Sequence, residues 1–218
     1  IFGRNHWNSC TIVSCGIGQG EVLETPLQIA NAMCLIGNHG YYYTPHLVQS
    51  IDGDTALLHP FRMKHETTHL SETDFEIVVN AMAQVVEQGT AKGAKIPGIE
   101  MCGKTGTAEN YAVINGKRTK LKDHSIFAAF APKDHPRIAI CVVVENSGYG
   151  ATYAAPIASL IVEKYLKDSI ATGPRTTMMQ NMMNANLIPG YITDLERQMT
   201  RREDSIKIAR QALNKGKK

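Results

Sequence analysis

The sequence lacks any run of eighteen apolar residues, and its first residues have none of the features of a signal peptide. We therefore expect no membrane-spanning segment within these 218 residues. Because the chain does not begin with methionine, we interpret it as a fragment and expect any membrane anchor to lie upstream. Only five cysteines are present, and they are scattered, which argues against a disulfide framework or a zinc ribbon. We expect most of them to be small buried side chains.

Most of the chain also lacks an excess of positive or negative charge. The net charge is +3, and residues 193–218 contain eight basic and four acidic residues, so this tail carries +4 and the rest about −1. A neutral body argues against nucleic acid as the main partner. We interpret the basic tail as a solvated segment. Apolar residues make up 43% of the chain, which is enough for a sizeable core.

Two capping patterns predict helices. Residues 25–28 read T-P-L-Q and residues 71–74 read S-E-T-D, and each places an N-cap hydroxyl three residues before a side chain that can complete a capping box. The first helix is predicted to stop at Gly37 or Gly40, and the second at Gly89. The apolar spacing predicts that the second helix buries Phe75, Val78, Val79, Met82, Val85 and Val86.

The pattern then changes to strands. Residues 99–107, 125–131 and 137–145 are predicted strands, and the short link P-K-D-H-P at 132–136 predicts an antiparallel hairpin between the last two. The run 138–144 is apolar throughout, as in a strand covered on both faces. A further helix is expected over 152–167. We expect residues 1–20 to be irregular and residues 41–51 to be extended. These elements predict an α+β fold with a mainly antiparallel sheet flanked by helices.

We divide the chain into residues 1–169, a main domain part, and residues 170–218, a linker followed by a basic helical tail. The shift to Thr, Met and Asn after Gly173 marks the linker. A capping-box pattern, T-D-L-E at 193–196, opens the helix of the tail.

The pattern G-K-T-G-T at residues 103–107 carries the clearest chemistry. In serine penicillin-recognising enzymes K-T-G lies on a strand at the edge of the active site. The ammonium of Lys104 and the hydroxyl of Thr107 suit a substrate carboxylate, and the backbone N–H of Thr107 suits an oxyanion. Gly106 leaves room for a substrate against the strand. We expect Thr105 to face the substrate as well, with strand packing as the alternative role of its side chain.

Two other chemistries compete for this region. Residues 98–105 match the P-loop pattern G-x-x-x-x-G-K-T, but no buried strand precedes Gly98 and no helical period follows Lys104. Residues 65–69 spell H-E-x-x-H, which on a helix would place His65 and His69 on a zinc ion with Glu66 as general base. That segment has no apolar stripe, so we interpret it as a loop. We therefore expect no metal and no cofactor.

The order of motifs resembles class B penicillin-binding proteins, and among them the elongation transpeptidases more than the division enzymes. The resemblance covers about residues 15–167. It rests on G-I-G-Q-G at 16–20, T-P-L-Q-I-A at 25–30, P-H-L at 45–47, G-T-A at 89–91, G-K-T-G-T-A-E at 103–109, D-H at 123–124, A-F-A-P at 129–132, V-V-E-N at 143–146 and A-P-I-A at 155–158. We interpret the glycines of the first motif as loop geometry, the D-H pair as structural and residues 147–150 as a turn.

The resemblance implies the fold of serine β-lactamases and a peptidoglycan D,D-transpeptidase reaction. A serine attacks the D-alanyl-D-alanine end of a stem peptide, the last alanine leaves, and the acyl group passes to an amine of a neighbouring stem. The implied partners are stem peptides, β-lactams and a glycosyltransferase of the elongation complex, and the implied location is the periplasmic side of the bacterial inner membrane.

The sequence departs from this family in one respect. No serine has lysine three places on, and none has asparagine two places on, so the S-x-x-K and S-x-N motifs are absent. Those motifs supply the nucleophile, the general base and half the oxyanion hole, which act as one unit. We therefore predict that this chain alone is inactive. A fragment that only binds partners is the non-enzymatic alternative.

Overall fold

The computed structural model describes residues 9–207, apart from residues 21, 68, 115, 189, 191, 193–196 and 198–199. Contacts divide the chain into two units, Ile1–Asn184 and Ala185–Lys218. In the second unit residues 200–207 are helical and exposed, whereas the predicted capping box at 193–196 lies outside the described residues. The expected boundary at residue 169 falls inside the first unit, which also includes helix α5 (Pro174–Asn184). No helix among the described residues is long and apolar enough to span a membrane.

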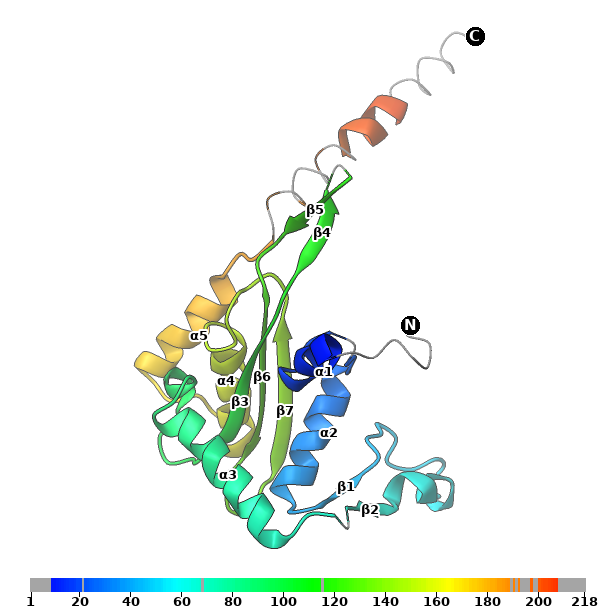
Figure 1. The fold of residues 1–218 in the computed structure, drawn as a ribbon, viewed down its shortest axis with the longest axis vertical. Coiled ribbons are helices and arrows are strands. Elements are labelled where there is room, and N and C mark those ends of the chain that lie inside the picture. The colour runs from blue at the N-terminus through cyan, green and yellow to red at the C-terminus, as the bar shows by residue number, and fades with distance from the viewer. Residues whose placement is uncertain are drawn as a thin grey trace. The chain divides into compact units, whose positions relative to one another are not determined.

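A three-stranded antiparallel sheet forms the centre of the first unit (Figure 1). Its strands are β3 (Cys102–Ala108), β6 (His124–Ala131) and β7 (Ile138–Val144), in the order β3-β6-β7. The predicted hairpin between the last two strands is confirmed. Strand β3 begins later than predicted, because an isolated bridge between Ile96 and Ile99 holds a tight turn around Gly98, whose φ is +73°.

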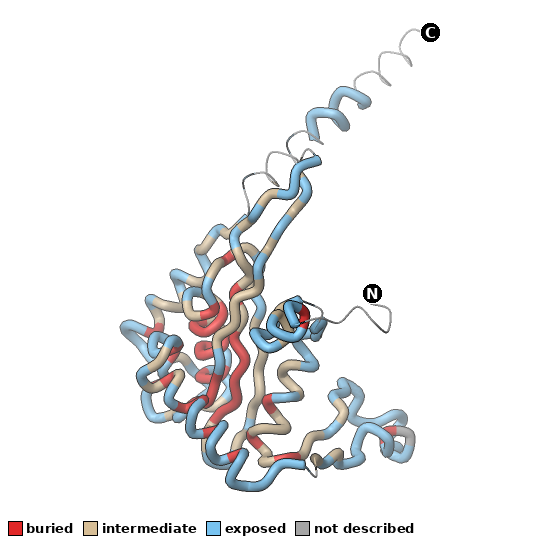
Figure 2. The backbone as a smooth tube through the Cα atoms, viewed as in Figure 1, coloured by how far each residue is buried: buried red, intermediate tan, exposed pale blue. Residues whose placement is uncertain are grey.

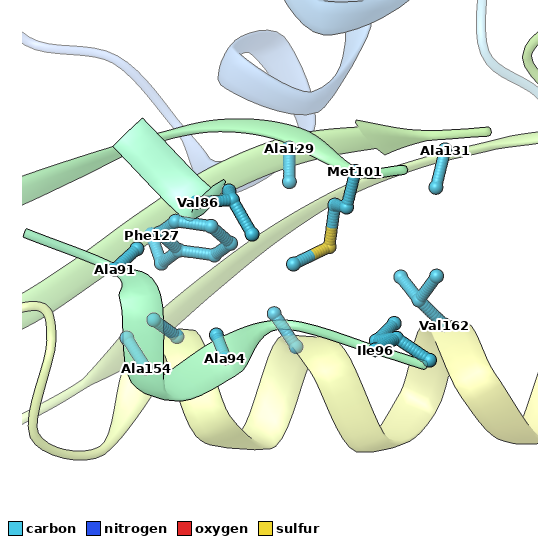
Figure 3. Close-up of a cluster of buried hydrophobic side chains, with 12 residues drawn as sticks. Val86, Ala91, Ala94, Ile96, Met101, Phe127, Ala129, Ala131, Ala154 and Val162 are labelled. Carbon is cyan, nitrogen blue, oxygen red and sulfur yellow. The ribbon is translucent and has the colours of Figure 1, made fainter. Parts of the chain in front are cut away.

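Helices cover both faces of this sheet. Helix α4 (Ala154–Lys167) packs on one face against Phe127, Ala129 and Ala131, together with η2 (Lys92–Ala94), as Figure 3 shows. Helices α2 (Pro26–Gly37) and α3 (Glu72–Glu87) pack on the other face, against Ala128 and Phe130. The buried residues are concentrated along β6 and α4 (Figure 2). Burying one large side chain such as Phe127 contributes about 1.5–3 kcal/mol. Helices on both faces of an antiparallel sheet confirm the predicted α+β fold.

Both predicted capping boxes are present. The side chain of Thr25 accepts the N–H of Gln28, the side chain of Ser71 accepts the N–H of Asp74, and both boxes are closed by the reciprocal bond. The predicted stripe of α3 is wrong at Val78, which is 42% exposed, because the buried residues follow Phe75, Val79, Met82, Ala83 and Val86. Val78 lies beside this stripe rather than on it.

Smaller elements complete the unit. Strand β1 (Tyr41–Tyr43) pairs with β2 (Lys64–Glu66), η1 (Ala56–Arg62) lies between them, and β4 (Tyr111–Ile114) pairs with β5 (Lys117–Lys120). Of the segment predicted to be extended, residues 41–51, only Tyr41–Tyr43 form a paired strand, and Ile51 makes an isolated bridge with Asp54. Helix α1 (Ser9–Gly16) contradicts the irregular prediction within residues 1–20, whereas residues 17–20 are irregular as predicted and residues 1–8 lie outside the described residues. Its short S-C-T-I-V-S-C sequence has few strong helix formers, which explains why propensity missed it.

The described cysteines are all free. Cys102 is buried, Cys15, Cys34 and Cys141 are half-buried, and Cys10 is exposed, so the expectation that most of the cysteines are buried is wrong.

Candidate functional site

The segment Lys104–Thr107 lies within β3, at an edge of the three-stranded sheet (Figure 1). Its only partner among the described strands is β6, so the opposite edge of β3 is unpaired in the part of the chain that the structure describes. Lys104 is exposed and the next three residues are half-buried. A strand rather than a loop and helix follows Gly103, so the P-loop alternative is wrong.

The register assigns these residues to the two faces of the sheet. Lys104 pairs with Ala128, which packs under α2 and α3, and Thr107 pairs with Ser125 on the α4 side. Side chains on a strand alternate between faces. The side chains of Lys104 and Thr107 therefore project from opposite faces of β3. A ligand that contacts both side chains must lie along the free edge of the strand.

The Lys104 ammonium donates a 2.9 Å hydrogen bond to the carbonyl oxygen of Thr105, its sequence neighbour. Among the described residues no carboxylate lies within ion-pair distance of it. The cation is thus available to an external anion.

Two residues reach this strand from other elements, and motif spacing alone did not assign them a role. The hydroxyl of Thr90, in the turn after α3, lies 3.1 Å from the hydroxyl of Thr105. Gly150, in the turn before α4, lies against the strand backbone, since a Cβ there would sit 2.6 Å from the carbonyl oxygen of Gly106. The G-T-A resemblance at 89–91 was the signal that could have identified Thr90. Nothing in the sequence indicated the contact of Gly150.

The two glycines of β3 differ in how much space a side chain would have. A Cβ at Gly103 would lie 2.4 Å from the ring of Phe127, so the core requires glycine there. A Cβ at Gly106 would approach the Cβ of Ile126 at 3.2 Å, which is tight but not prohibitive. The absence of a side chain at Gly106 leaves the strand backbone more accessible to a ligand.

Cys102 is the thiol nearest in sequence to Lys104. Burial, together with a smaller effect of the nearby Glu100 carboxylate, raises the pKa of this thiol from 9.0 to about 12. A thiol with this pKa is almost entirely protonated at neutral pH, and the thiolate is the reactive form. Cys102 is therefore a core side chain and no substitute for a catalytic serine.

The H-E-x-x-H segment does not have the geometry of a zinc site. His65 and Glu66 lie in strand β2, whereas the zinc alternative requires a helix. His65 stacks on Tyr42 with 5.0 Å between ring centroids, and Glu66 pairs with Lys64. Within the described ranges no three His, Cys, Asp or Glu residues are close enough to hold a metal ion. The loop interpretation is wrong for His65 and Glu66, because β2 pairs with β1, and it is confirmed for His69, which lies in an exposed bend.

The remaining motif residues have structural contacts. The ring Nδ1 of His124 accepts the N–H of Asn146 at 3.2 Å, and the carbonyl oxygen of Asp123 accepts the N–H of Gly148 at 2.7 Å. Gly18 and Gly20 have φ values of +76° and +78°, as loop glycines do.

Comparison with known proteins decides the family. The family profile described as penicillin binding protein transpeptidase domain matches residues 2–163. The chain belongs to this family. Peptidoglycan D,D-transpeptidase MrdA of Acinetobacter baumannii is 31% identical over 204 residues, which cover 87% of this chain and 30% of that protein. The chain thus spans about a third or less of the length of such relatives.

Solved structures agree with this assignment to the penicillin-binding proteins. Pseudomonas aeruginosa PBP2 in complex with WCK 5153 aligns with a TM-score of 0.62 and 29% identity, covering 75% of this chain and 34% of that one. Penicillin-binding protein A from M. tuberculosis, an imipenem acyl-enzyme complex, aligns with a TM-score of 0.59 and 28% identity, covering 73% and 35%. The chain is therefore similar to one part of each of these proteins.

Proposed function

We propose that this chain is the part of a peptidoglycan D,D-transpeptidase that holds the carboxylate end of a stem peptide. The observation that carries the proposal is Lys104, an exposed cation without a carboxylate partner among the described residues, on a free edge strand. Relatives named peptidoglycan D,D-transpeptidase and a relative solved as an imipenem acyl-enzyme support the reaction class and β-lactams as ligands.

The free edge of β3 suits a peptide that adds to the sheet as a further strand. Main-chain hydrogen bonds then supply affinity, and side chains at the edge select the ligand. Lys104 and the Thr107 hydroxyl would bind the terminal carboxylate, Gly106 would admit the peptide backbone, and the N–H of Thr107 would donate to the oxyanion. Thr105, which Thr90 contacts, lines the same edge.

In the proposed reaction a serine hydroxyl attacks the carbonyl carbon between the two terminal D-alanines. The serine proton passes to a base, the C–N bond breaks, and the leaving D-alanine takes up a proton at its amine. The acyl-serine ester then reacts with the amine of a second stem, which regenerates the serine. The N–H of Thr107 would stabilise the tetrahedral intermediate in each half of the reaction.

The sequence contains neither S-x-x-K nor S-x-N, so we propose that this chain alone does not form the acyl-enzyme. Incubation of the native chain with a fluorescent penicillin, followed by denaturing electrophoresis, should give no labelled band. A penicillin-binding protein with an S-x-x-K serine provides the positive control. A label bound covalently at one equivalent per chain would refute the proposed inactivity.

The carboxylate subsite can be tested separately from the chemistry. Amide chemical shifts of the ¹⁵N-labelled chain should change in β3 on titration with D-alanyl-D-alanine, and less with the L,L dipeptide. Loss of a charge-assisted hydrogen bond costs about 1.5–3 kcal/mol, so Lys104→Met should weaken binding by at least about tenfold. Lys133→Met is the matched control, since Lys133 lies in the link that follows β6, outside β3, and pairs with Glu100. Equal effects of the two variants would contradict the proposal.

We further propose, from the resemblance of the ordered motifs to class B penicillin-binding proteins, that the whole protein works on the periplasmic side of the inner membrane. It would act with a glycosyltransferase of the elongation complex and have an anchor upstream of these residues. Crosslinking of the membrane-bound full-length protein in its host would test the partner.

A further inference from the structure

The β4–β5 ribbon, which consists of the paired strands Tyr111–Ile114 and Lys117–Lys120, continues directly from the candidate site. Strand β3 ends at Ala108, the ribbon follows, and the chain returns to the sheet at His124, which pairs with Ala108 (Figure 1). The N–H of Leu121 donates to the carbonyl oxygen of Asn110 at 2.9 Å and closes the base of the ribbon. Any peptide bound along β3 past Ala108 therefore meets this ribbon.

One face of the ribbon combines cations with apolar side chains. The register pairs Tyr111 with Lys120 and Val113 with Arg118, which places all four side chains on one face. The Arg118 guanidinium lies 4.2 Å from the centroid of the Tyr111 ring, and the Lys120 ammonium lies 5.4 Å from it. Tyr111 is 41% and Val113 is 74% exposed, so this face is open to a ligand.

The charges on this face are not all neutralised. Lys120 pairs with Glu109 at 3.0 Å and with Asp123 at 3.4 Å. Arg118 stacks on Tyr111 but has no ion-pair partner among the described residues. Arginine on an aromatic ring keeps its outward N–H groups available to a carboxylate. Arg118 is thus the cation of the ribbon most available to an external carboxylate.

The direction of a bound peptide brings it to this face. A peptide that pairs antiparallel with β3 and ends at Lys104–Thr107 must place its upstream residues toward Ala108 and the ribbon. At about 3.3 Å per residue, Tyr111 lies at most roughly 13 Å beyond Thr107 along the chain. A five-residue stem peptide spans about 17 Å when extended, so its upstream residues reach the ribbon.

We propose that the β4–β5 ribbon, through Arg118, binds a carboxylate in the upstream part of the stem peptide. This inference rests on the proposed function and names the substrate feature that the ribbon selects. A γ-linked glutamyl residue in a stem has a free α-carboxylate, which is the chemistry that a guanidinium beside an aromatic ring recognises. The terminal carboxylate remains bound by the Thr107 hydroxyl, from which the distance to Tyr111 is counted, and by the Lys104 ammonium.

Titration of the ¹⁵N-labelled chain tests the inference with three peptides. These are D-alanyl-D-alanine, a stem pentapeptide with a free glutamyl α-carboxylate, and the same pentapeptide with that carboxylate amidated. Only the charged pentapeptide should shift the ribbon amides strongly, and it should bind about two- to fivefold more tightly than the amidated one, as expected for an exposed ion pair. This difference should shrink in high salt.

Variants assign the effect to one side chain. Arg118→Gln should abolish the difference between the charged and amidated pentapeptides, Arg118→Lys should keep most of it, and both should leave dipeptide binding unchanged. Arg137→Gln is the matched control, because Arg137 is also an exposed arginine and lies just before β7, at the far end of the sheet. The amide spectrum of each variant reports whether it is folded.

The outcomes separate this inference from the proposed function. If β3 responds to all three peptides but the ribbon does not, or if Arg118→Gln behaves like Arg137→Gln, the ribbon subsite is refuted and the proposed function stands. An equal ribbon response to acetate at the same concentration would also refute it, because any anion would then suffice. If β3 responds to none of the peptides, the proposed function and this inference both fail.

Discussion

Removing Arg175 should destabilise the chain strongly, because it would leave a buried carboxylate without its cation. Glu163 of α4 is fully buried and Arg175 of α5 is 6% exposed. The Arg175 Nε donates to the Glu163 carboxylate at 2.8 Å, and its Nη1 donates to the hydroxyl of Ser159 at 3.0 Å. The N–H of Ala171 donates to the second Glu163 oxygen at 3.3 Å. This network attaches α5 to α4.

The size of the effect follows from desolvation. Breaking a buried ion pair by removing one partner costs about 3–5 kcal/mol, whereas replacing both partners by apolar residues is often neutral or stabilising. We therefore expect Arg175→Met to lower the free energy of unfolding by about 3–5 kcal/mol, a large part of the roughly 5–15 kcal/mol typical of a domain. The double variant E163L/R175M should recover most of that loss.

Urea unfolding followed by circular dichroism measures these free energies. Lys133→Met is the control, since the Lys133–Glu100 pair, at 3.3 Å, is partly exposed and its loss should cost less than about 1 kcal/mol. If Arg175→Met costs no more than this control, or if the double variant is less stable than the single one, the argument from buried charge is wrong.

Three further predictions follow from single positions. Gly150→Ala should destabilise the chain by at least about 1–3 kcal/mol, because the added Cβ would lie 2.3 Å from the carbonyl oxygen of Ile126. Thermal unfolding measures this loss, and Gly93→Ala is the control, because a Cβ at Gly93 would meet no atom within 4 Å. The raised pKa of Cys102, about 12 against 9.0 when unfolded, stabilises the fold below pH 9. That stability should be lost as the pH rises from about 9 to 12, so urea midpoints should fall over this range, and a Cys102→Ala variant should show a smaller fall. Thr25→Ala should cost about 1 kcal/mol through loss of its helix cap, measured by the same urea titration.

The elements that the sequence predicted well depend on neighbours along the chain. The caps at Thr25 and Ser71 form with residues three places on, so local spacing is sufficient to place these helix starts. The β6–β7 hairpin likewise follows from two apolar runs joined by a short link. The ordered motifs indicated the family, because several short matches in sequence order are far more specific than any single one.

The errors concern burial and weak local signals. Val78 has the right spacing for the apolar stripe of α3, but the packing of α3 against β3 and α2 decides which residues of the helix are covered. Helix α1 is short and rich in Ser, Cys and β-branched residues, so its propensity predicts no helix. For Val78, tertiary packing decides a burial that helical spacing alone does not determine.

The sequence by itself determined the residue types of the proposed carboxylate site, because the ammonium of Lys104, the hydroxyl of Thr107 and the missing side chain of Gly106 are properties of single residues. Only the tertiary structure decided that these residues lie on a free sheet edge, with Thr90 beside Thr105 and Gly150 against Gly106. The physical reason is that an edge is defined by the absence of a neighbouring strand. Strand neighbours are chosen by long-range packing, which local patterns do not encode.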